Sequence, residues 1–203
     1  MLARETVELL IQAARAAQAA RNACDLGPAE WMALRFFARA NAQSRKPSDL
    51  ADFEASSRAA VSHVIGRLEH GGYVERKPSP EDRRSYCVEV TAKGLAMLSD
   101  DPIEALVQSV RSLPEDSRDA LHDALQSVLT GLAVSGTRRQ FNTCRDCAYL
   151  IAAQAGETES SDRVLECDLF HVALDHGATQ QLCARFRPAT VPGSSTSGER
   201  AAG

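Results

Sequence analysis

Apolar residues recur along most of the first 132 residues with the spacing of amphipathic helices, at one position in every three or four. Proline and glycine mark several of the boundaries. Pro28 and Pro47 stand at early helical positions, and Gly71 and Gly72 stop a helix as a C-terminal cap does. The pattern therefore predicts six helices, which span or begin at residues 2–21, 27, 47–55, 57–70, 91–113 and 114–132.

The helix over residues 57–70 combines an apolar face with a polar one, and Ser56 or Ser57 can cap its start. The side chains that we expect to point inward are Ala60, Val61, Val64, Ile65 and Leu68. Those on the opposite face are Arg58, Ser62, His63 and Arg67. After the two glycines, residues 73–77 and 85–90 alternate as short strands do, and PSPEDRR joins them.

Two short helices with a tight connection, followed by a strand–loop–strand, are typical of a winged helix-turn-helix. We therefore predict a mainly α fold with a small β wing over residues 1–135. The periodicity breaks around SGTRR, and residues 140–187 are expected to form a separate cysteine-rich module. Residues 188–203 are small, polar and non-periodic, as in a disordered tail.

Charge and composition narrow the class of protein. The formal net charge is −4, so no global basic field indicates nucleic acid, and any basic surface must be local. The first helix carries interspersed charges, unlike a signal peptide, and no apolar run is long enough to span a bilayer. We expect a cytoplasmic protein, in which six cysteines favour metal ligands or buried thiols over disulfides.

The polar face of the helix over residues 57–70 suits the major groove of DNA. Arg58 and Arg67 can bind guanine or phosphate, Ser57 and Ser62 suit phosphate oxygens, and His63 can act either way. At the tip of the wing, Arg83 and Arg84 could enter the minor groove, where negative potential is concentrated. The alternative is a solvated helix face and a charged turn, and the order of the motifs favours DNA.

The segments SSRAAVSHVIGRLEHGGYVER and PSPEDRRSYCVEVTAKG, together with the two helices after them, resemble the MarR family of bacterial transcriptional regulators. The resemblance runs from about Arg4 to Leu132. It implies a homodimer formed by the N- and C-terminal helices, and two recognition helices that read a pseudo-palindromic operator in double-stranded DNA. It also implies that Asp82 pairs with Arg84 and orients it for the minor groove, and that a small phenolic ligand or an oxidant could release the DNA.

The segment beyond the family pattern contains four cysteines. Cys144 and Cys147 form a Cys-x-x-Cys pair, Cys167 follows after 19 residues, and Cys183 after a further 15. Four thiolates fit either Zn²⁺ or an iron–sulfur cluster, and the lack of a second Cys-x-x-Cys keeps the cluster in consideration. His171 and His176 are possible substitute ligands, although a surface-loop role suits them better.

Two further interpretations of these thiols stay open. They could simply pack as buried side chains, or Cys144 and Cys147 could form a redox-active dithiol. Elsewhere, Cys87 fits a small strand residue. Cys24 could be a redox sensor, but the neighbouring Asp25 disfavours a thiolate and favours a structural role.

These observations lead to one principal hypothesis: a homodimeric DNA-binding transcriptional regulator, expected to be a repressor, with a four-cysteine site that senses redox or iron state or stabilises the C-terminus. The alternatives are a protein-interaction adaptor with a structural zinc module, and a ligand- or thiol-responsive regulator without metal. No nucleophile elbow or phosphate-binding loop occurs, so we do not expect an enzyme.

Overall fold

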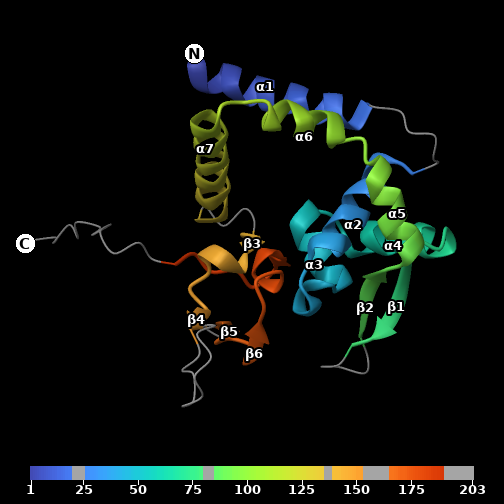
Figure 1. The fold of residues 1–203 in the computed structure, drawn as a ribbon. Helices are drawn as coiled ribbons and strands as arrows, with labels where there is room; N and C mark the ends of the chain where they lie inside the picture. Colours follow the sequence, from blue (N-terminus) through green and yellow to red (C-terminus); the bar gives the residue numbers. More distant parts are fainter. Residues whose placement is uncertain (20–25, 80–84, 135–138, 153–164, 190–203) are drawn as a thin grey trace, which may run out of the picture.

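The computed structural model describes residues 1–19, 26–79, 85–134, 139–152 and 165–189. Most of these residues are helical, as predicted (Figure 1). The helices are α1 (Leu2–Ala19), α2 (Pro28–Arg39), α3 (Pro47–Glu54), α4 (Arg58–His70), α5 (Ala92–Met97), α6 (Glu104–Arg111) and α7 (Glu115–Val134). Short 3₁₀ turns lie at η1 (Ala42–Ser44), η2 (Leu98–Asp100), η3 (Cys144–Asp146) and η4 (Ala178–Gln180).

The described strands form three small antiparallel sheets. The predicted wing is present as a hairpin of β1 (Val74–Pro78) and β2 (Tyr86–Val90). The C-terminal segment contributes a two-stranded and a three-stranded sheet, which the sequence pattern did not predict. Their strands are β3 (Asn142–Thr143) paired with β7 (Leu182–Cys183), and β4 (Leu150–Ala152), β5 (Leu165–Cys167) and β6 (Val172–Leu174) in that order.

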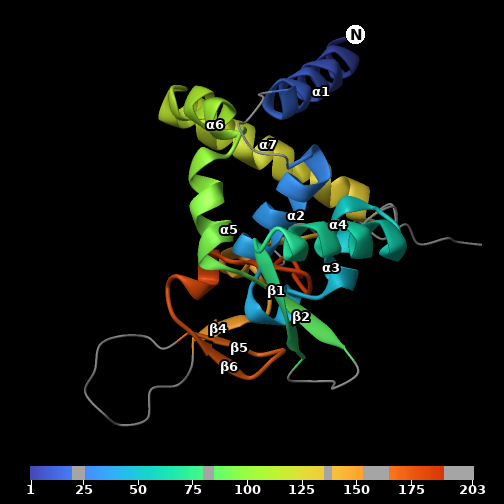
Figure 2. The ribbon, with the colours of Figure 1, turned by 90° about the vertical axis from the view of Figure 1, so that its right-hand side faces the viewer.

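The core lies where α2, α3 and α4 pack against the base of the wing, and we call this unit the head (Figure 2). The periodic positions of α2 and α4 fill it as predicted, with one exception. Ala60 is exposed, whereas we expected it to point inward. Each residue turns the helix by about 100°, which places Ala60 at the flank of the stripe that begins at Val61. The buried apolar side chains of α2 and α4 include Trp31, Leu34, Phe36, Phe37, Val61, Val64, Ile65 and Leu68.

The predicted continuous helix over residues 91–113 is wrong, because the chain breaks between α5 and α6. Pro102 has no amide hydrogen and disfavours a helical conformation for the residue before it. Asp101 then serves two partners: its Oδ1 accepts the amide of Ile103 at 2.9 Å, and its two oxygens bind the Arg35 guanidinium at 2.6 Å each. This bidentate pair ties the break to α2.

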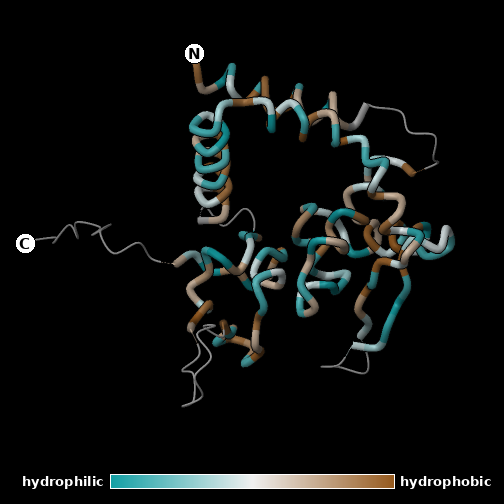
Figure 3. The backbone as a smooth tube through the Cα atoms, in the orientation of Figure 1, coloured by the Kyte–Doolittle hydropathy of each residue, from teal (hydrophilic) through white to brown (hydrophobic). Residues whose placement is uncertain are grey.

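Three helices project beyond the head: α1 and α6 pack together, and α7 runs on from α6 (Figures 1 and 2). Apolar positions recur along α1 and α7 as they do inside the head (Figure 3). Within the described chain these positions are not covered: the exposed ones include Val7, Leu10 and Ile11 of α1 and Val128, Leu129 and Leu132 of α7. No helix in the described residues is long and apolar enough to cross a membrane.

Candidate nucleic-acid interface and cysteine cluster

Helix α4 begins at a side-chain cap, as its sequence predicted. The Ser57 hydroxyl accepts the amide hydrogen of Ala60 at 3.1 Å. A hydroxyl that accepts in this way still has its own proton to donate, so Ser57 can cap the helix and also bind a phosphate oxygen. At the other end Gly72 adopts a left-handed φ of +73°, the conformation that lets the chain turn from α4 into β1.

The outer face of α4 carries the polar side chains that we assigned to DNA. Arg58, Ser62 and His63 are exposed there. A shallow hollow runs along this face, and a Cβ atom built on Gly66 would meet no other atom within 4 Å. The residues that line the hollow are Leu26, Ser62, His63, Gly66, Arg67, His70, Gly71 and Tyr73.

Arg67 differs from the other three outward residues of α4, because it has a partner inside the subunit. Its guanidinium lies 3.1 Å from Glu30 of α2, whose side chain is only 7% exposed. A guanidinium has five N–H donors, so this ion pair leaves donors for a phosphate or a base. Arg67 therefore links the recognition face to α2, a role that its outward position in the sequence did not reveal.

The two wing strands carry charges along their exposed faces. Lys77 lies 2.6 Å from Glu89 and 3.0 Å from Glu75, and these bonds, with Glu89 the stronger influence, raise the pKa of the Lys77 ammonium. Arg76 binds Glu69 of α4 at 3.2 Å and stacks over the Tyr86 ring. The wing-tip residues Asp82, Arg83 and Arg84 lie outside the described residues, so their roles stay predictions.

A compact junction holds the base of the wing against the end of α4. Thr91 accepts the amide of Gly94 at 3.1 Å, which caps α5, and donates to the carbonyl of Gly72 at 2.7 Å. Gly94 is needed for its lack of a side chain, because a Cβ there would overlap the backbone carbonyl of Tyr73. The spacing Thr91-x-x-Gly94 in the sequence was the signal for this junction.

The four cysteines of the C-terminal segment line one small cavity. Cys144, Cys147 and Cys183 are buried, and Cys167 is partly buried. The Cys147 amide donates to the Cys144 carbonyl at 3.1 Å, which closes the Cys-x-x-Cys turn. Strand pairing brings the other two cysteines to the same cavity. Cys167 of β5 pairs with Leu150 of β4, and Cys183 of β7 pairs with Asn142 of β3. None of these four forms a disulfide.

Two of these thiols interact directly. A hydrogen bond with Cys144 lowers the pKa of Cys183 to about 6, and the same bond, followed by burial, raises the pKa of Cys144. The two thiols therefore titrate as a pair, with the thiolate favoured at Cys183. The Cys183 Sγ also accepts the Arg185 amide at 3.4 Å, a bond that favours the thiolate.

The cavity is nevertheless not a preformed metal site. Among the described residues, no group of three or more His, Cys, Asp or Glu side chains is arranged to hold a metal ion. All four cysteines line the same cavity, so they are neighbours in the fold. Holding an ion would require their sulfurs to be arranged as a tetrahedral shell.

The remaining cysteine and histidine predictions have different outcomes. Cys87 is buried on β2, opposite Lys77, as expected for a small strand residue. His171 and His176 are exposed, which agrees with the surface-loop role. Cys24 lies outside the described residues.

The C-terminal segment packs directly against the head, a contact that the sequence pattern missed. Leu182 is 6% exposed and belongs to the core of the head. It forms a parallel bridge with Ala40, and the Asn41 amide donates to its carbonyl at 2.9 Å. Phe141 adds a second contact, since its ring meets those of Phe36 and Phe53 at centroid distances of 6.2 and 5.2 Å. The strand has only two residues, too few for a local sequence pattern to predict it.

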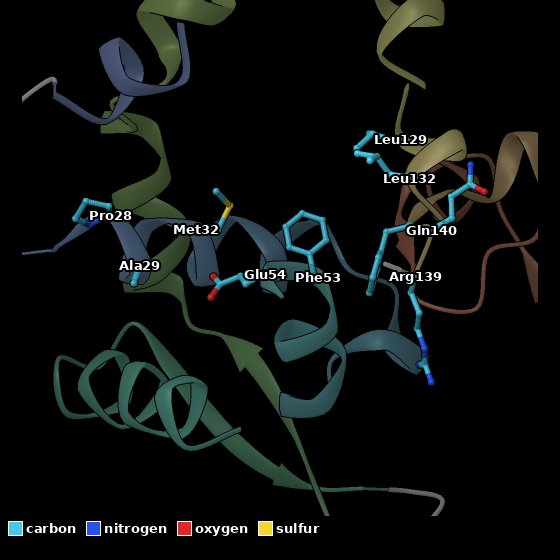
Figure 4. A pocket seen from close by; sticks show the side chains of 10 residues that line it. Pro28, Ala29, Met32, Phe53, Glu54, Leu129, Leu132, Arg139 and Gln140 are labelled. Carbon is cyan, nitrogen blue, oxygen red and sulfur yellow. The ribbon is translucent and has the colours of Figure 1, made fainter. Parts of the chain in front are cut away.

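A cavity of about 510 Å³ lies between the head and α7 (Figure 4). Apolar side chains of α2 and α3, among them Met32 and Phe53, line it from one side, and Leu129 and Leu132 of α7 from the other. Glu54 also lines it. Burial raises the pKa of this carboxyl, and its Oε1 atom has no hydrogen-bond partner in the part of the chain that the structure describes.

Part of the chain is similar to known transcriptional regulators. Residues 25–85, which cover α2 to the wing, match the model of the MarR family. A putative transcriptional regulatory protein for the hcr operon of Thauera aromatica is 32% identical over 93 residues, which are 46% of this chain and 53% of that protein. The match therefore spans about half the length of this curated relative.

Solved structures share the fold. The transcriptional regulator BldR from Sulfolobus solfataricus superposes with a TM-score of 0.52 and 21% identity, over 64% of this chain and 92% of BldR. A MarR/EmrR family transcriptional regulator from Acinetobacter sp. ADP1 gives a TM-score of 0.50 and 22% identity, over 65% and 94% of the two chains. The chain thus has a winged helix-turn-helix fold of the MarR type, and its C-terminal segment is additional to it.

Proposed function

We propose that this chain is a sequence-specific DNA-binding transcriptional regulator of the MarR type, which represses its target promoters as a homodimer. The observation that carries the proposal is the outer face of α4, where Arg58, Ser62 and His63 are exposed beside the wing. The match of residues 25–85 to the MarR family covers this same unit. Members of that family are transcriptional regulators and not enzymes.

The geometry suggests how α4 would read DNA. In helix-turn-helix proteins the N-terminal residues of the recognition helix contact base edges, and Arg58 is the first residue of α4. Ser62 and His63 follow one turn later on the exposed face. Gly66 leaves room for the DNA to approach the helix, and Arg67, anchored by Glu30, would bind phosphate and fix the register.

The homodimer would use the helices that project from the head. Exposed apolar positions on α1 and α7 are numerous, and a monomer seldom leaves so many uncovered on neighbouring elements. Packing these faces against a second copy would bury them and set two α4 helices on successive major grooves of a pseudo-palindromic site.

Arg58→Ala provides the direct test of the DNA interface. Losing a base-contacting arginine typically costs about 1–3 kcal/mol of binding, or roughly 5- to 150-fold in affinity. The assay is fluorescence anisotropy with the operator fragment selected by the wild-type protein, and light scattering checks that the dimer persists. Arg187→Ala, which removes an exposed arginine of the C-terminal segment, is the matched control. Equal affinity of R58A and R187A would contradict the assignment of α4.

Arg84→Ala tests the wing separately. We expect weaker operator binding by an intact dimer, because the arginine at the wing tip would enter the minor groove. Binding at the wild-type level would remove the wing from the interface and leave the assignment of α4 in place.

The four cysteines would hold either Zn²⁺ or an iron–sulfur cluster. The convergence of four sulfurs on one cavity, with Cys183 favoured as a thiolate, supports this proposal, because thiolates are the ligands that both groups take from proteins. Zinc would stabilise the segment, and a cluster would make it responsive to redox or iron state. Metal analysis and the visible spectrum of an anaerobic preparation distinguish the two, and Cys144→Ser should lose the metal.

A second candidate is a thiol-responsive regulator without metal. It is favoured by the lack of a preformed metal group among the described residues, together with the coupled Cys144 and Cys183 thiols. The same anaerobic preparation decides, because a metal-free protein would support this alternative.

The cavity between the head and α7 is where a small-molecule effector would bind. Its volume of about 510 Å³ lies within the usual range of ligand pockets, roughly 300–1,000 Å³. Most of the lining is apolar, Arg139 and Gln140 add polar groups, and Glu54 Oε1 lacks a hydrogen-bond partner among the described residues, so the cavity suits a largely apolar molecule that carries a hydrogen-bond donor. Met32→Trp, on the head side of the cavity, should fill it and abolish any release of DNA by such a ligand.

A further inference from the structure

The strand that ends in Cys183 runs along η1, the turn that joins α2 to α3. The strand and the two residues after it meet the head at three points. Leu182 enters the core beside Ala40, and the Ala184 amide donates to the buried Ser44 hydroxyl at 2.9 Å. Arg185 then lies 3.5 Å from Asp49 of α3.

Cys183 is the residue of this strand that belongs to both units. On one side its sulfur lines the cysteine cavity and is hydrogen-bonded to Cys144. On the other side, the two residues that flank it are bonded to the η1 turn: the Leu182 carbonyl accepts the Asn41 amide at 2.9 Å, and the Ala184 amide donates to the Ser44 hydroxyl. A candidate ligand of the cluster is therefore flanked by direct contacts with the helix-turn-helix.

The contact between Arg185 and Asp49 connects the C-terminal segment, through α3, to the recognition helix α4. Asp49 is 1% exposed and stands in the first turn of α3, which packs against α4. Buried polar groups such as Asp49 and Ser44 have few alternative partners, so the positions of η1 and α3 depend on the segment that supplies the donor for Ser44 and the opposite charge for Asp49.

We propose that the C-terminal strand couples the cysteine cluster to the DNA-reading helices of its own subunit, through Cys183, Ala184 and Arg185 on η1 and α3. The inference rests on the proposed function, since it presumes that the cluster binds a metal and that α4 reads DNA. It adds a route within one subunit, which needs no change at the dimer interface.

The physical reason is the rigidity of the contact. A metal held by all four sulfurs would fix Cys183 in a coordination shell. The residues on either side of it are attached to the head, since Leu182 lies in its core and the Ala184 amide is bonded to Ser44. Packed interfaces of this kind change between discrete arrangements and do not stretch smoothly. The orientation of α3, and with it α4, is thus linked to the state of the cluster.

The test compares the full chain loaded with Zn²⁺ alone against the same reduced protein after chelation. Hydrogen exchange of residues 47–54 is the main readout, and operator affinity is the second. In the wild type, removing zinc should speed exchange in α3 several-fold and change operator affinity, with little effect on α1. Zinc stoichiometry is measured separately on every sample.

Ser44→Ala removes the acceptor for the Ala184 amide and leaves all four cysteines in place. This variant should bind zinc with the wild-type stoichiometry, and zinc removal should now alter α3 exchange and operator affinity much less. Gln180→Ala is the matched control, because it removes only an exposed bond with Arg145 inside the segment. Arg185→Ala, at an exposed position, gives a second way to weaken the contact if the serine variant folds poorly.

The outcomes separate the two proposals. Wild-type protein that takes up zinc without any change in α3 exchange overturns the coupling, as does a Ser44→Ala variant that responds like the wild type. Protein that takes up no zinc overturns the four-thiolate site and the coupling together. Protein that responds in α3 but binds no operator refutes the regulator proposal and upholds the structural coupling.

Discussion

Leu182→Ala should destabilise the DNA-binding head, although the residue lies in the C-terminal segment. Leu182 is 6% exposed and packs in the core formed by α2, α3 and α4. Replacing a buried leucine by alanine costs about 2–5 kcal/mol, the lost transfer free energy plus that of the cavity. Because β7 has only two residues and lies at the rim of the head, we expect the lower half of this range, about 2–3 kcal/mol.

Trp31 provides the assay, since it is the only tryptophan of the chain and is buried in the head. Urea unfolding followed by its fluorescence reports the head itself. With a slope of about 2 kcal/mol/M, the expected loss lowers the midpoint by about 1–1.5 M. Protein concentration is held constant, because dimerisation would contribute to the apparent stability.

Ile151→Ala is the control, a similar truncation at a position of β4 that is 41% exposed. Its effect should stay within about 0.5 kcal/mol, as for most surface substitutions. If the Trp31 transition of Leu182→Ala shifts no more than that of this control, then β7 does not complete the core of the head, and the proposed coupling loses its basis.

Two alanine substitutions of glycine should have opposite effects. Gly66→Ala should stabilise α4 by about 0.5–1 kcal/mol in thermal unfolding, because the added Cβ meets no neighbouring atom. The same variant should weaken operator binding, and undiminished affinity would show that DNA does not enter the hollow. Gly94→Ala should destabilise by about 1–3 kcal/mol, since its Cβ overlaps the Tyr73 backbone, and a wild-type melting temperature would contradict that overlap. Glu54→Gln should stabilise the protein at neutral pH. Burial raises the pKa of Glu54 in the folded state above its ordinary value of 4.5, so the folded state binds the proton more tightly. The wild type therefore loses stability as pH rises from about 4.5 through the folded pKa. The advantage of the glutamine variant in urea midpoints should therefore grow between acidic and neutral pH, and a constant difference would refute this assignment.

Local patterns were sufficient to predict the head and the outer face of α4. The periodicity of Val61, Val64, Ile65 and Leu68 identifies the buried side of the helix, and the cap at Ser57 identifies its start, because both depend on neighbours within a few residues. The exposed side then follows by exclusion. The helix break at Pro102 is also a local feature and could have been predicted from the proline. It was missed because the apolar periodicity continues on both sides of the proline.

Contacts between distant segments could not be read in this way. Arg67 and Glu30 lie on different helices, and only their packing shows that the arginine is paired. The strand at Leu182 is too short to show a period, and its partner Ala40 belongs to a loop far away in the chain. The spacing of the four cysteines did indicate that they converge. It contained no information on the second role of Cys183 as a neighbour of Ser44.

The position of β7 also has a consequence for biosynthesis. Residues 28–90 contain the helices and strands of the head, but the side chain that closes their core is supplied by Leu182, near the end of the described chain. A nascent chain that has emerged only as far as α7 therefore lacks Leu182, and the apolar core residues that Leu182 would cover are exposed. Such surfaces are what chaperones and proteases act upon. Protein made from a message that ends before β7 should be cleared, so only chains that also carry the cysteine segment would accumulate and compete for DNA.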